Sequence, residues 1–320
     1  MISVIICSKE QHHLERLSQN IRETIGVPYE IIATDNSVRQ EGICAVYNSA
    51  ASKARFSLLC FVHEDVLFDT PEWGKKIFMH LQNKDIGLIG IAGGDAKSLV
   101  PSSWYIPARS NHIHVFQHYR YNDTKPTHIL VTDPNNDCNA KRASALDGVF
   151  LCTRKEVFDQ HPFDEVLFRG FHGYDIDYSL QVSTTHELLS ISDILIHHFS
   201  EGRPNRQWME STLQVSRKWK KRLPVSVHPL THKEFGDHHW AAMQMFIQRL
   251  VTMDYSTLAI SRYFIYYSFN SFFTIRRFGS MTKYLLTCLA ERASDERKKT
   301  LAEPSIQNAF VNPEPVKQRQ

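Results

Sequence analysis

The chain has 320 residues, of which 42% are hydrophobic and 22% are charged, as is usual for a globular protein with a sizeable core. This length allows one large domain with an appendage, or two domains. A formal charge of only +3 gives no global argument for nucleic acid, so we expect no nucleic-acid partner.

The six cysteines form no C-x-x-C pair, and Cys7, Cys60 and Cys152 lie in apolar runs where a free thiol behaves as a small hydrophobe. This pattern indicates a reducing compartment and no disulfide scaffold. The chain opens on an apolar run without a basic segment before it, and no stretch reaches the roughly 18 apolar residues of a membrane span. We therefore expect a cytoplasmic protein, at most attached to the inner face of the membrane.

The first third of the chain predicts alternating strands and helices. Short apolar runs indicate strands at residues 1–7, 29–34 and 58–62, and apolar residues at helical spacing indicate helices at 10–25 and 42–54. The order βαβαβ predicts a parallel sheet with right-handed crossovers.

The middle of the chain continues this alternation around an insert. Strands are predicted at residues 86–92, 146–153 and 188–197, with helices at 73–83, 155–159 and 174–183. Residues 97–143 are instead rich in Ser, Pro, Asn, Tyr and His, with alternating stretches at 113–119 and 128–131. We interpret this insert as a loop and a hairpin laid over the sheet.

The pattern changes again after Gly202. A basic amphipathic helix is predicted at residues 207–223, followed by aromatic-rich helices at 239–250, 257–277 and 281–292. We therefore divide the chain into an α/β domain at 1–203, a helical region at 204–293 and a flexible tail at 294–320.

Acids and histidines gather at the predicted strand ends and the loops beside them. They are Asp35, Glu64 and Asp65, Asp147, Asp175 and Asp177, and His197 and His198. Together, carboxylates and imidazoles suit Mn²⁺ or Mg²⁺ with open positions for substrate phosphates. Each also has an ordinary interpretation: Asp35 as a turn or cap residue, Asp175 as a favourable charge at a helix start, and His198 as a core histidine.

The order of these elements resembles the GT-A fold, and in particular the bacterial family-2-like glycosyltransferases. The resemblance rests on SVIICS, EIIATDNS, GICAVYNSAASKARFSLLCFVHEDV, IGLIGIAGG, LDGVFLCTRKEVFD, FDEVLFRGFHGYDIDYSLQV and SDILIHHFSEG, which follow the family's order over residues 1–203. It implies an α/β fold with a Rossmann-like, mostly parallel sheet flanked by helices, here with a helical C-terminal extension.

The resemblance also implies a function. A member of this family transfers a sugar from a nucleotide-diphospho-sugar donor to a glycan, lipid-linked or small-molecule acceptor in polysaccharide biosynthesis. We expect the transfer to be inverting and assisted by Mn²⁺ or Mg²⁺. 

Positions in the family's motifs carry over to single residues. The resemblance implies a donor-binding set of Ser8, Asp35, Asn48, Arg55, Glu64, Asp147 and Gly148. It implies Asp65 and His198 as metal ligands and Asp175 as the general base. Trp104 and Asp177 are expected on the acceptor side. The chain departs from the family at His63, which stands where the D-x-D metal motif has its first acid.

Other functions fit the sequence less well. A sugar nucleotidylyltransferase would need a glycine-rich, basic loop after the first strand, where this chain has Ser8-Lys9-Glu10-Gln11. An NAD-dependent enzyme would need G-x-G-x-x-G at that place. A catalytically silent sugar- or nucleotide-binding module on the same fold is favoured only by His63.

Two further patterns have open interpretations. His112 and His114 have a metal-ligand spacing, but they lie in the insert with no third ligand nearby in sequence, so exposure or acceptor contact is favoured. The aromatic residues at 264–273, followed by Arg276 and Arg277, would suit a helix on a membrane surface. Packing on the main domain, or a homodimer interface, is favoured there.

Overall fold

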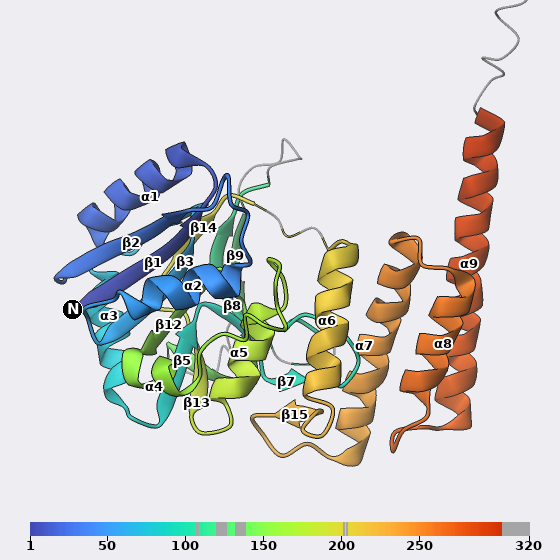
Figure 1. Cartoon of the computed structure of the whole chain (residues 1–320). Coiled ribbons are helices and arrows are strands. Elements are labelled where there is room, and N and C mark those ends of the chain that lie inside the picture. The colour runs from blue at the N-terminus through green and yellow to red at the C-terminus, as the bar shows by residue number, and fades with distance from the viewer. Residues whose placement is uncertain are drawn as a thin grey trace, which may run out of the picture.

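The computed structural model describes residues 1–106, 109, 111–119, 127–131, 139–200, 202 and 204–302 (Figure 1). Parts of the predicted insert and most of the predicted tail, from residue 303 onward, lie outside these described residues. The α/β part and a group of helices stand side by side.

A seven-stranded sheet forms the centre of the α/β part. Its order is β10 (Ala140–Ala143), β13 (Glu187–Ile191), β5 (Ile86–Gly90), β12 (Phe150–Arg154), β3 (Leu58–His63), β1 (Ile2–Ser8) and β2 (Tyr29–Asp35). β1 pairs in parallel with both β2 and β3, and β13 pairs in parallel with β5. β12 is antiparallel to both of its neighbours. The prediction of a mostly parallel α/β sheet is confirmed.

Helices cover both faces of this sheet because its strands are apolar on both sides. Along β3, Leu59 and Phe61 face one core, whereas Cys60 and Val62 face the other. The first core is covered by α2 (Ile43–Ser52), α4 (Lys155–Gln160) and α5 (Tyr174–Val182). The second is covered by α1 (Gln11–Thr24) and α3 (Trp73–Gln82). A doubly covered sheet leaves its strand ends as the place for polar chemistry.

A second sheet lies beside the first. It contains β11 (Ala145–Leu146), β6 (Ala92–Gly94), β8 (Asn111–Gln117), β14 (Ile196–His198) and β4 (Val66–Phe68), with β9 (Thr127–Val131) paired to β8. The predicted hairpin in the insert is therefore confirmed as β8 and β9.

Three predicted strands were wrong in their extent. The runs at 86–92, 146–153 and 188–197 each divide into two strands, one in each sheet. Each bend between the two sheets is short and apolar residues resume directly after it, so the run does not show where one strand ends. These bends matter because they place Asp147 and His198 beside the carboxyl end of β3.

Cys60 and Cys152 correct the prediction of unpaired thiols. They face each other across the antiparallel β3–β12 pair and are joined by a disulfide, at a sequence separation of 92 residues. Among the described residues, Cys7, Cys44 and Cys288 are free. The sequence could not show the pairing because it follows from the position of β12 next to β3.

The C-terminal region is helical, as predicted, with different bounds. It contains α6 (Arg206–Lys218), α7 (His232–Thr252), α8 (Thr257–Ser268) and α9 (Ile275–Ala302). α7 begins earlier than predicted because Thr231 and Glu234 form a capping box. Within the described chain, no helix combines the length and the hydropathy that a membrane span requires.

Asp177 joins α6 to the α/β part of the chain. This contact corrects the prediction that Asp177 lies on the acceptor side. The two oxygens of this carboxylate, which is 2% exposed, accept hydrogen bonds from Lys218 Nζ at 2.8 Å and Trp219 Nε1 at 2.7 Å. Residues two apart on a helix point to different sides, so Asp177 turns toward α6 while Asp175 does not. A short strand pair adds a second link, between β15 (Val225–Ser226) and β7 (Ala96–Lys97).

We expect Asp177→Ala to lower the free energy of unfolding by about 1.5–3 kcal/mol, because it removes two hydrogen bonds, one of them charge-paired, from a buried site. Urea unfolding measures this. Asp159→Ala is the matched control, since its carboxylate is 56% exposed and pairs with Lys155 one helical turn away. It should cost less than about 1 kcal/mol. Equal losses in the two variants would contradict the tie between α5 and α6.

Candidate active site

Two histidines and an aspartate meet at the carboxyl end of β3. His63 ends β3, Asp65 lies in the turn to β4, and His198 ends β14. β14 pairs with β4, so that His198 lies opposite Val66. One ligand atom from each of His63, Asp65 and His198 lies within 4.8 Å of the other two. The predicted metal ligands Asp65 and His198 are therefore side by side, and His63 joins them.

The carboxylate of Asp65 is prepared to bind a cation. Its Oδ2 accepts a hydrogen bond from Ser200 Oγ at 2.5 Å, and its buried Oδ1 has no hydrogen-bond partner in the described part of the chain. Burial raises the pKa of Asp65, but the imidazoles of His63 and His198 and the Ser200 hydrogen bond lower it further, so the carboxyl ionises below its usual range.

The donor set fits a divalent cation of the Mn²⁺ or Mg²⁺ type, since it offers an ionised carboxylate oxygen and imidazole nitrogens with room for further ligands. A buried oxygen without a donor is costly unless something binds it, which supports this interpretation. His63 is the residue that sequence reasoning missed. The usable signal was that imidazole is itself a metal ligand, so a histidine at the first position of D-x-D can preserve the site.

Tyr174 connects this group to the next part of the site. Its hydroxyl lies 2.9 Å from His63 Nε2 and 2.9 Å from the carbonyl oxygen of Gly148. A carbonyl only accepts, so Tyr174 donates to Gly148 and His63 Nε2 donates to Tyr174. Neutral His63 then carries its lone pair on Nδ1. Position 148 must be glycine, because a Cβ there would collide with the Tyr174 hydroxyl.

Asp175 lies in the first turn of α5, beside Gly148 and Asp147. Its Oδ2 accepts a hydrogen bond from the Gly148 backbone N–H at 3.3 Å. Burial and, secondarily, the negative charge of Asp147 raise the pKa of Asp175 to about 7. A carboxylate with this pKa is half ionised near neutral pH, which suits general acid–base work.

Trp104 reaches the same place from the insert. Its indole Nε1 donates to Asp147 Oδ2 at 2.6 Å, while Asp147 Oδ1 accepts from the Val149 backbone N–H at 2.9 Å. Asp147 is therefore held on both oxygens. The predicted residues Trp104, Asp147, Gly148 and Asp175 are brought together.

Ser8 and Glu64 bind each other, which revises their predicted contact with a donor. Glu64 Oε2 accepts from Ser8 Oγ at 2.6 Å and from the backbone N–H groups of Lys9 at 3.0 Å and Glu10 at 3.1 Å. Glu64 thus fixes the loop between β1 and α1. Asp35, opposite Ser8 in the β1–β2 register, is exposed at the same edge, where its Oδ1 accepts from the Ser37 N–H at 2.9 Å.

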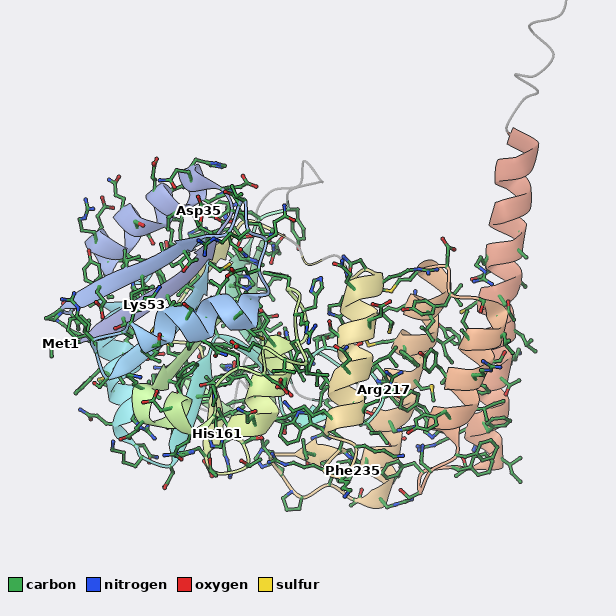
Figure 2. The ribbon with its side chains drawn as sticks, in the orientation of Figure 1. Met1, Asp35, Lys53, His161, Arg217 and Phe235 are labelled. Atoms are coloured by element: carbon green, nitrogen blue, oxygen red, sulfur yellow. A yellow bond between two sulfur atoms is a disulfide. The ribbon has the colours of Figure 1, made fainter. Side chains whose placement is uncertain are left out.

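The prediction that Arg55 binds the donor was wrong. Its Nε lies 2.7 Å from Glu30 Oε2, and Glu30 is near the start of β2, about 16 Å along the strand from Asp35. Figure 2 shows Asp35 and Lys53 toward opposite ends of the sheet, with Lys53 on the side of Met1. The resemblance implied a place near the site for Arg55 because it lies shortly before the metal motif, but β3 runs from that far edge to the site.

Asn48 also has a structural partner. Its side-chain amide donates to the Phe163 carbonyl at 2.9 Å and to Glu165 at 2.8 Å, and its oxygen accepts from the Phe163 N–H at 3.1 Å. Asn48 therefore holds the loop that precedes α5, in place of its predicted contact with the donor.

The histidines of the insert are used in the fold as well. His112 is 4% exposed and its Nδ1 lies 3.0 Å from Ser190 Oγ, while His114 Nδ1 lies 3.2 Å from the Ile194 carbonyl. The expectation that they are exposed or contact an acceptor is corrected for His112, which is in the core between the two sheets.

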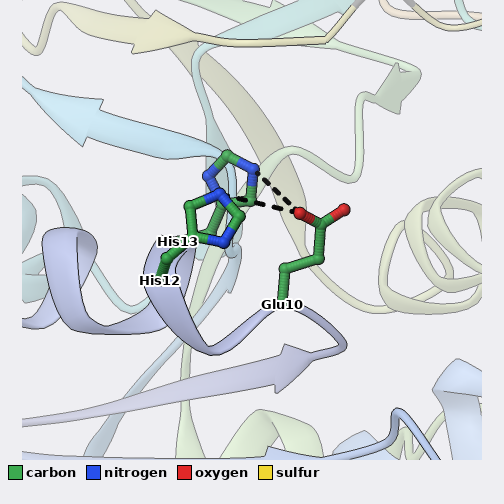
Figure 3. Close-up of side chains that lie close together, drawn as sticks. All are labelled: Glu10, His12 and His13. Carbon is green, nitrogen blue, oxygen red and sulfur yellow. Dashed lines mark ion pairs between the residues drawn. The ribbon is translucent and has the colours of Figure 1, made fainter.

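A second group of imidazoles and a carboxylate lies at the start of α1. Figure 3 shows His12 and His13 turned toward Glu10, with both Nε2 atoms 3.6 Å from Glu10 Oε2. The His12 side chain is 70% exposed. Glu10 and His12 in this group are exposed, whereas His63, Asp65 and His198 are all partly buried.

Two surface pockets lie away from the candidate site. Two pockets of about 290 and 160 Å³ lie around Ser183, His186 and Glu187. Glu187 begins β13, opposite the start of β5, so both pockets are at the opposite edge of the sheet from the end of β3. The chemistry, rather than the depth of a pocket, identifies the site.

Solved structures of glycosyltransferases are similar to this chain. GalNAc-T7 with UDP, GalNAc and Mn²⁺ is similar with a TM-score of 0.50 and 10% identity, over 83% of this chain and 55% of that one. The mannosyltransferase PcManGT from Pyrobaculum calidifontis, in complex with GDP-Man and Mn²⁺, has a TM-score of 0.41 and 10% identity, over 92% of this chain and 87% of that one. This chain spans about half the length of GalNAc-T7, and likeness at this identity shows the fold alone.

No curated protein matches the chain in sequence. Residues 3–217, more than half of the chain, match the family described as glycosyltransferase-like. The match covers both sheets and continues into α6. The chain therefore belongs to the glycosyltransferase-like family.

Proposed function

We propose that this chain transfers a sugar from a nucleotide-diphospho-sugar to an acceptor hydroxyl with inversion of the anomeric configuration. The observation that carries the proposal is a continuous set of contacts at one edge of the sheet. It runs from Asp65 and His198 through His63, Tyr174 and Gly148 to Asp175 and Asp147. A group suited to a cation and a group suited to a base are thus held at a fixed separation.

His63, Asp65 and His198 would hold Mn²⁺ or Mg²⁺. A cation bound there would supply positive charge to the departing nucleoside diphosphate. GalNAc-T7, whose fold this chain shares, was solved with UDP and Mn²⁺, which supports the assignment. The residues around the cation site prepare it for binding. Ser200 and His198 favour the ionised form of Asp65, and Tyr174 accepts the Nε2 proton of His63, so this proton does not point at the cation site.

Asp175 is the proposed general base. In its ionised form it would take the proton of the acceptor hydroxyl as that oxygen attacks the anomeric carbon from the face opposite the diphosphate. The Gly148 N–H fixes Oδ2 of Asp175 and so orients the carboxylate. Burial and, secondarily, the charge of Asp147 raise the pKa of Asp175. Trp104, held by Asp147, would present an indole face to an acceptor sugar.

Asp35 is the proposed contact for the nucleoside. It is exposed at the end of β2, at the same sheet edge as Ser8, so its carboxylate is accessible to a ligand. The hydrogen bond from Ser37 favours its ionised form and lowers the pKa of Asp35, so it would accept hydrogen bonds from ribose hydroxyls or a base.

A screen of nucleotide-sugars by thermal shift, with and without Mn²⁺, identifies the donor, since ligands that bind the native state raise Tm. Donor turnover is then measured as nucleoside diphosphate release, and the anomeric configuration of the product by NMR. Donor binding without any turnover would favour a silent binding module, and a retained configuration would contradict the inverting mechanism.

Asp175→Asn should lower turnover by about 10²–10⁴-fold while donor binding persists, because the amide keeps the shape but cannot take a proton. Diphosphate release and the donor-induced rise in Tm measure the two effects separately. Asp159→Asn, on the exposed face of α4, is the matched control and should leave both unchanged. Undiminished turnover in Asp175→Asn would remove this residue from the mechanism.

The pH profile should have an acidic limb near pH 7, because the pKa of Asp175 is raised to about 7 and the base must be deprotonated. Activity is then full above this pH and falls about tenfold per unit below it. Asp147→Asn removes a negative charge that raises this pKa, so the limb should move to lower pH. Asp85→Asn, an exposed acid at the other edge of the sheet, should leave it in place. An acidic limb that stays at the same pH in Asp147→Asn would contradict the assignment of Asp175 as the base.

Loss of a proposed ligand should weaken Mn²⁺ binding. We expect His63→Ala and Asp65→Asn each to raise the Kd for Mn²⁺ by more than the roughly 10–100-fold seen when only an outer partner of a ligand is lost. Isothermal titration calorimetry without donor measures this independently of activity. His12→Ala is the matched control, since it removes an imidazole from the other cluster. If His12→Ala caused the larger loss, the ion would belong to α1.

A further inference from the structure

The two parts of the chain differ in charge. Residues 1–203 contain 19 Lys and Arg against 25 Asp and Glu, a formal charge of −6, whereas residues 204–320 contain 18 against 9, a formal charge of +9. Residues 255–290 include four basic residues and no acid. A basic region beside an acidic one indicates an anionic partner for the basic region.

The same acid-free segment exposes large apolar side chains. On α8, Leu258, Ile265, Tyr266 and Phe269 are 53–62% exposed. Their spacing places them on one side of the helix, together with exposed Arg262. The opposite side of α8 is already used, because Ile260, Phe264 and Tyr267 are buried in the core of the helical region. The predicted packing of the aromatic segment is therefore confirmed for that side only.

This surface continues beyond α8. Phe269 stacks on Phe273 with ring centroids 5.0 Å apart, and Ile275, at the start of α9, is 83% exposed next to exposed Arg276. At the other side, Lys220 Nζ from the end of α6 lies 5.5 Å from the centre of the Tyr266 ring. We name this surface the α8 face and define it as Leu258, Arg262, Ile265, Tyr266, Phe269, Ile275 and Arg276, with Lys220 at its border.

We propose that the α8 face docks on an anionic membrane surface. Its apolar and aromatic side chains would enter the boundary between headgroups and acyl chains, and its basic side chains would pair with lipid phosphates. α8 and α9 are the helices farthest from the central sheet, so contact there leaves the sheet edge with the candidate site uncovered (Figure 1). The proposed contact is peripheral.

Two other occupants fit the charges and side chains less well. A two-fold dimer through the α8 face would bring Arg262 and Arg276 of both copies together with no acid on the face to neutralise them. A nucleic acid would match the charge, but the exposed Leu258, Ile265 and Ile275 would have no role, since they are neither charged nor aromatic. A lipid surface uses both properties.

Co-sedimentation of the full chain with phosphatidylcholine vesicles, with and without phosphatidylglycerol, tests the proposal. We expect binding only with the anionic lipid, weakened by salt. Arg262→Gln and Arg276→Gln should each reduce binding about fivefold. The double variant Ile265→Glu/Phe269→Glu should reduce it by at least about tenfold, because it replaces two apolar contacts by repelled charges.

Matched variants of the α/β part should bind as the parent does. Phe78→Glu/Met79→Glu changes two apolar side chains of α3 that are 50% and 60% exposed, and Arg39→Gln/Lys53→Gln removes two exposed charges. Unchanged Tm in all variants shows that folding is intact, and the assay needs no sugar transfer, so its result is independent of the proposed function.

Three outcomes would overturn the proposal. One is no binding to anionic vesicles at low salt. Another is binding that the charge variants weaken but Ile265→Glu/Phe269→Glu does not, which would assign the face to a soluble polyanion such as RNA. The last is a dimer in sedimentation velocity that Ile265→Glu/Phe269→Glu dissociates while vesicle binding is unchanged, which would make the face a contact between copies of this chain.

Discussion

The candidate site depends on the contact between the Tyr174 hydroxyl and Gly148. The backbone of Gly148 has both of its polar groups in use: its carbonyl accepts from Tyr174 and its N–H donates to Asp175. The Tyr174 hydroxyl in turn accepts a hydrogen bond from His63 Nε2. One glycine thus sets the orientation of a proposed metal ligand and of the proposed base. Because a Cβ at residue 148 would occupy the position of the hydroxyl, any other residue would separate the two halves of the site.

The pKa values of two carboxylates of the site are shifted in opposite directions by their surroundings. Both are desolvated, which alone raises a carboxyl pKa. Around Asp65 this effect is outweighed by His63, His198 and Ser200, so the group ionises readily. Around Asp175 the neighbouring charge is that of Asp147, which adds to the effect of burial. The first is therefore suited to hold a cation permanently, and the second to exchange a proton near neutral pH.

Sequence periodicity predicted the elements whose ends coincide with a change of polarity. β3, for example, stops being apolar at His63, where it leaves the core. It failed where a run crosses between the sheets, as at Asp147 and between β13 and β14, because apolar residues resume directly after the short bend. The site was predictable at the strand ends for the same reason. Arg55, Asn48 and Asp177 were misplaced because the edge of a sheet or the side of a helix on which a residue lies depends on packing that no local pattern records.

α6 links the candidate site to the α8 face. Lys218 and Lys220 are two residues apart at its end, yet Lys218 Nζ lies 2.8 Å from Asp177 whereas Lys220 lies over Tyr266. Asp177 is in turn two residues from Asp175 on α5. This end of α6 therefore contacts both the helix that carries the proposed base, through the ion pair with Asp177, and the α8 face, through Lys220. If the α8 face rests on a membrane, the sheet edge with Asp175 takes one orientation to the lipid surface, which suits an acceptor presented at that surface.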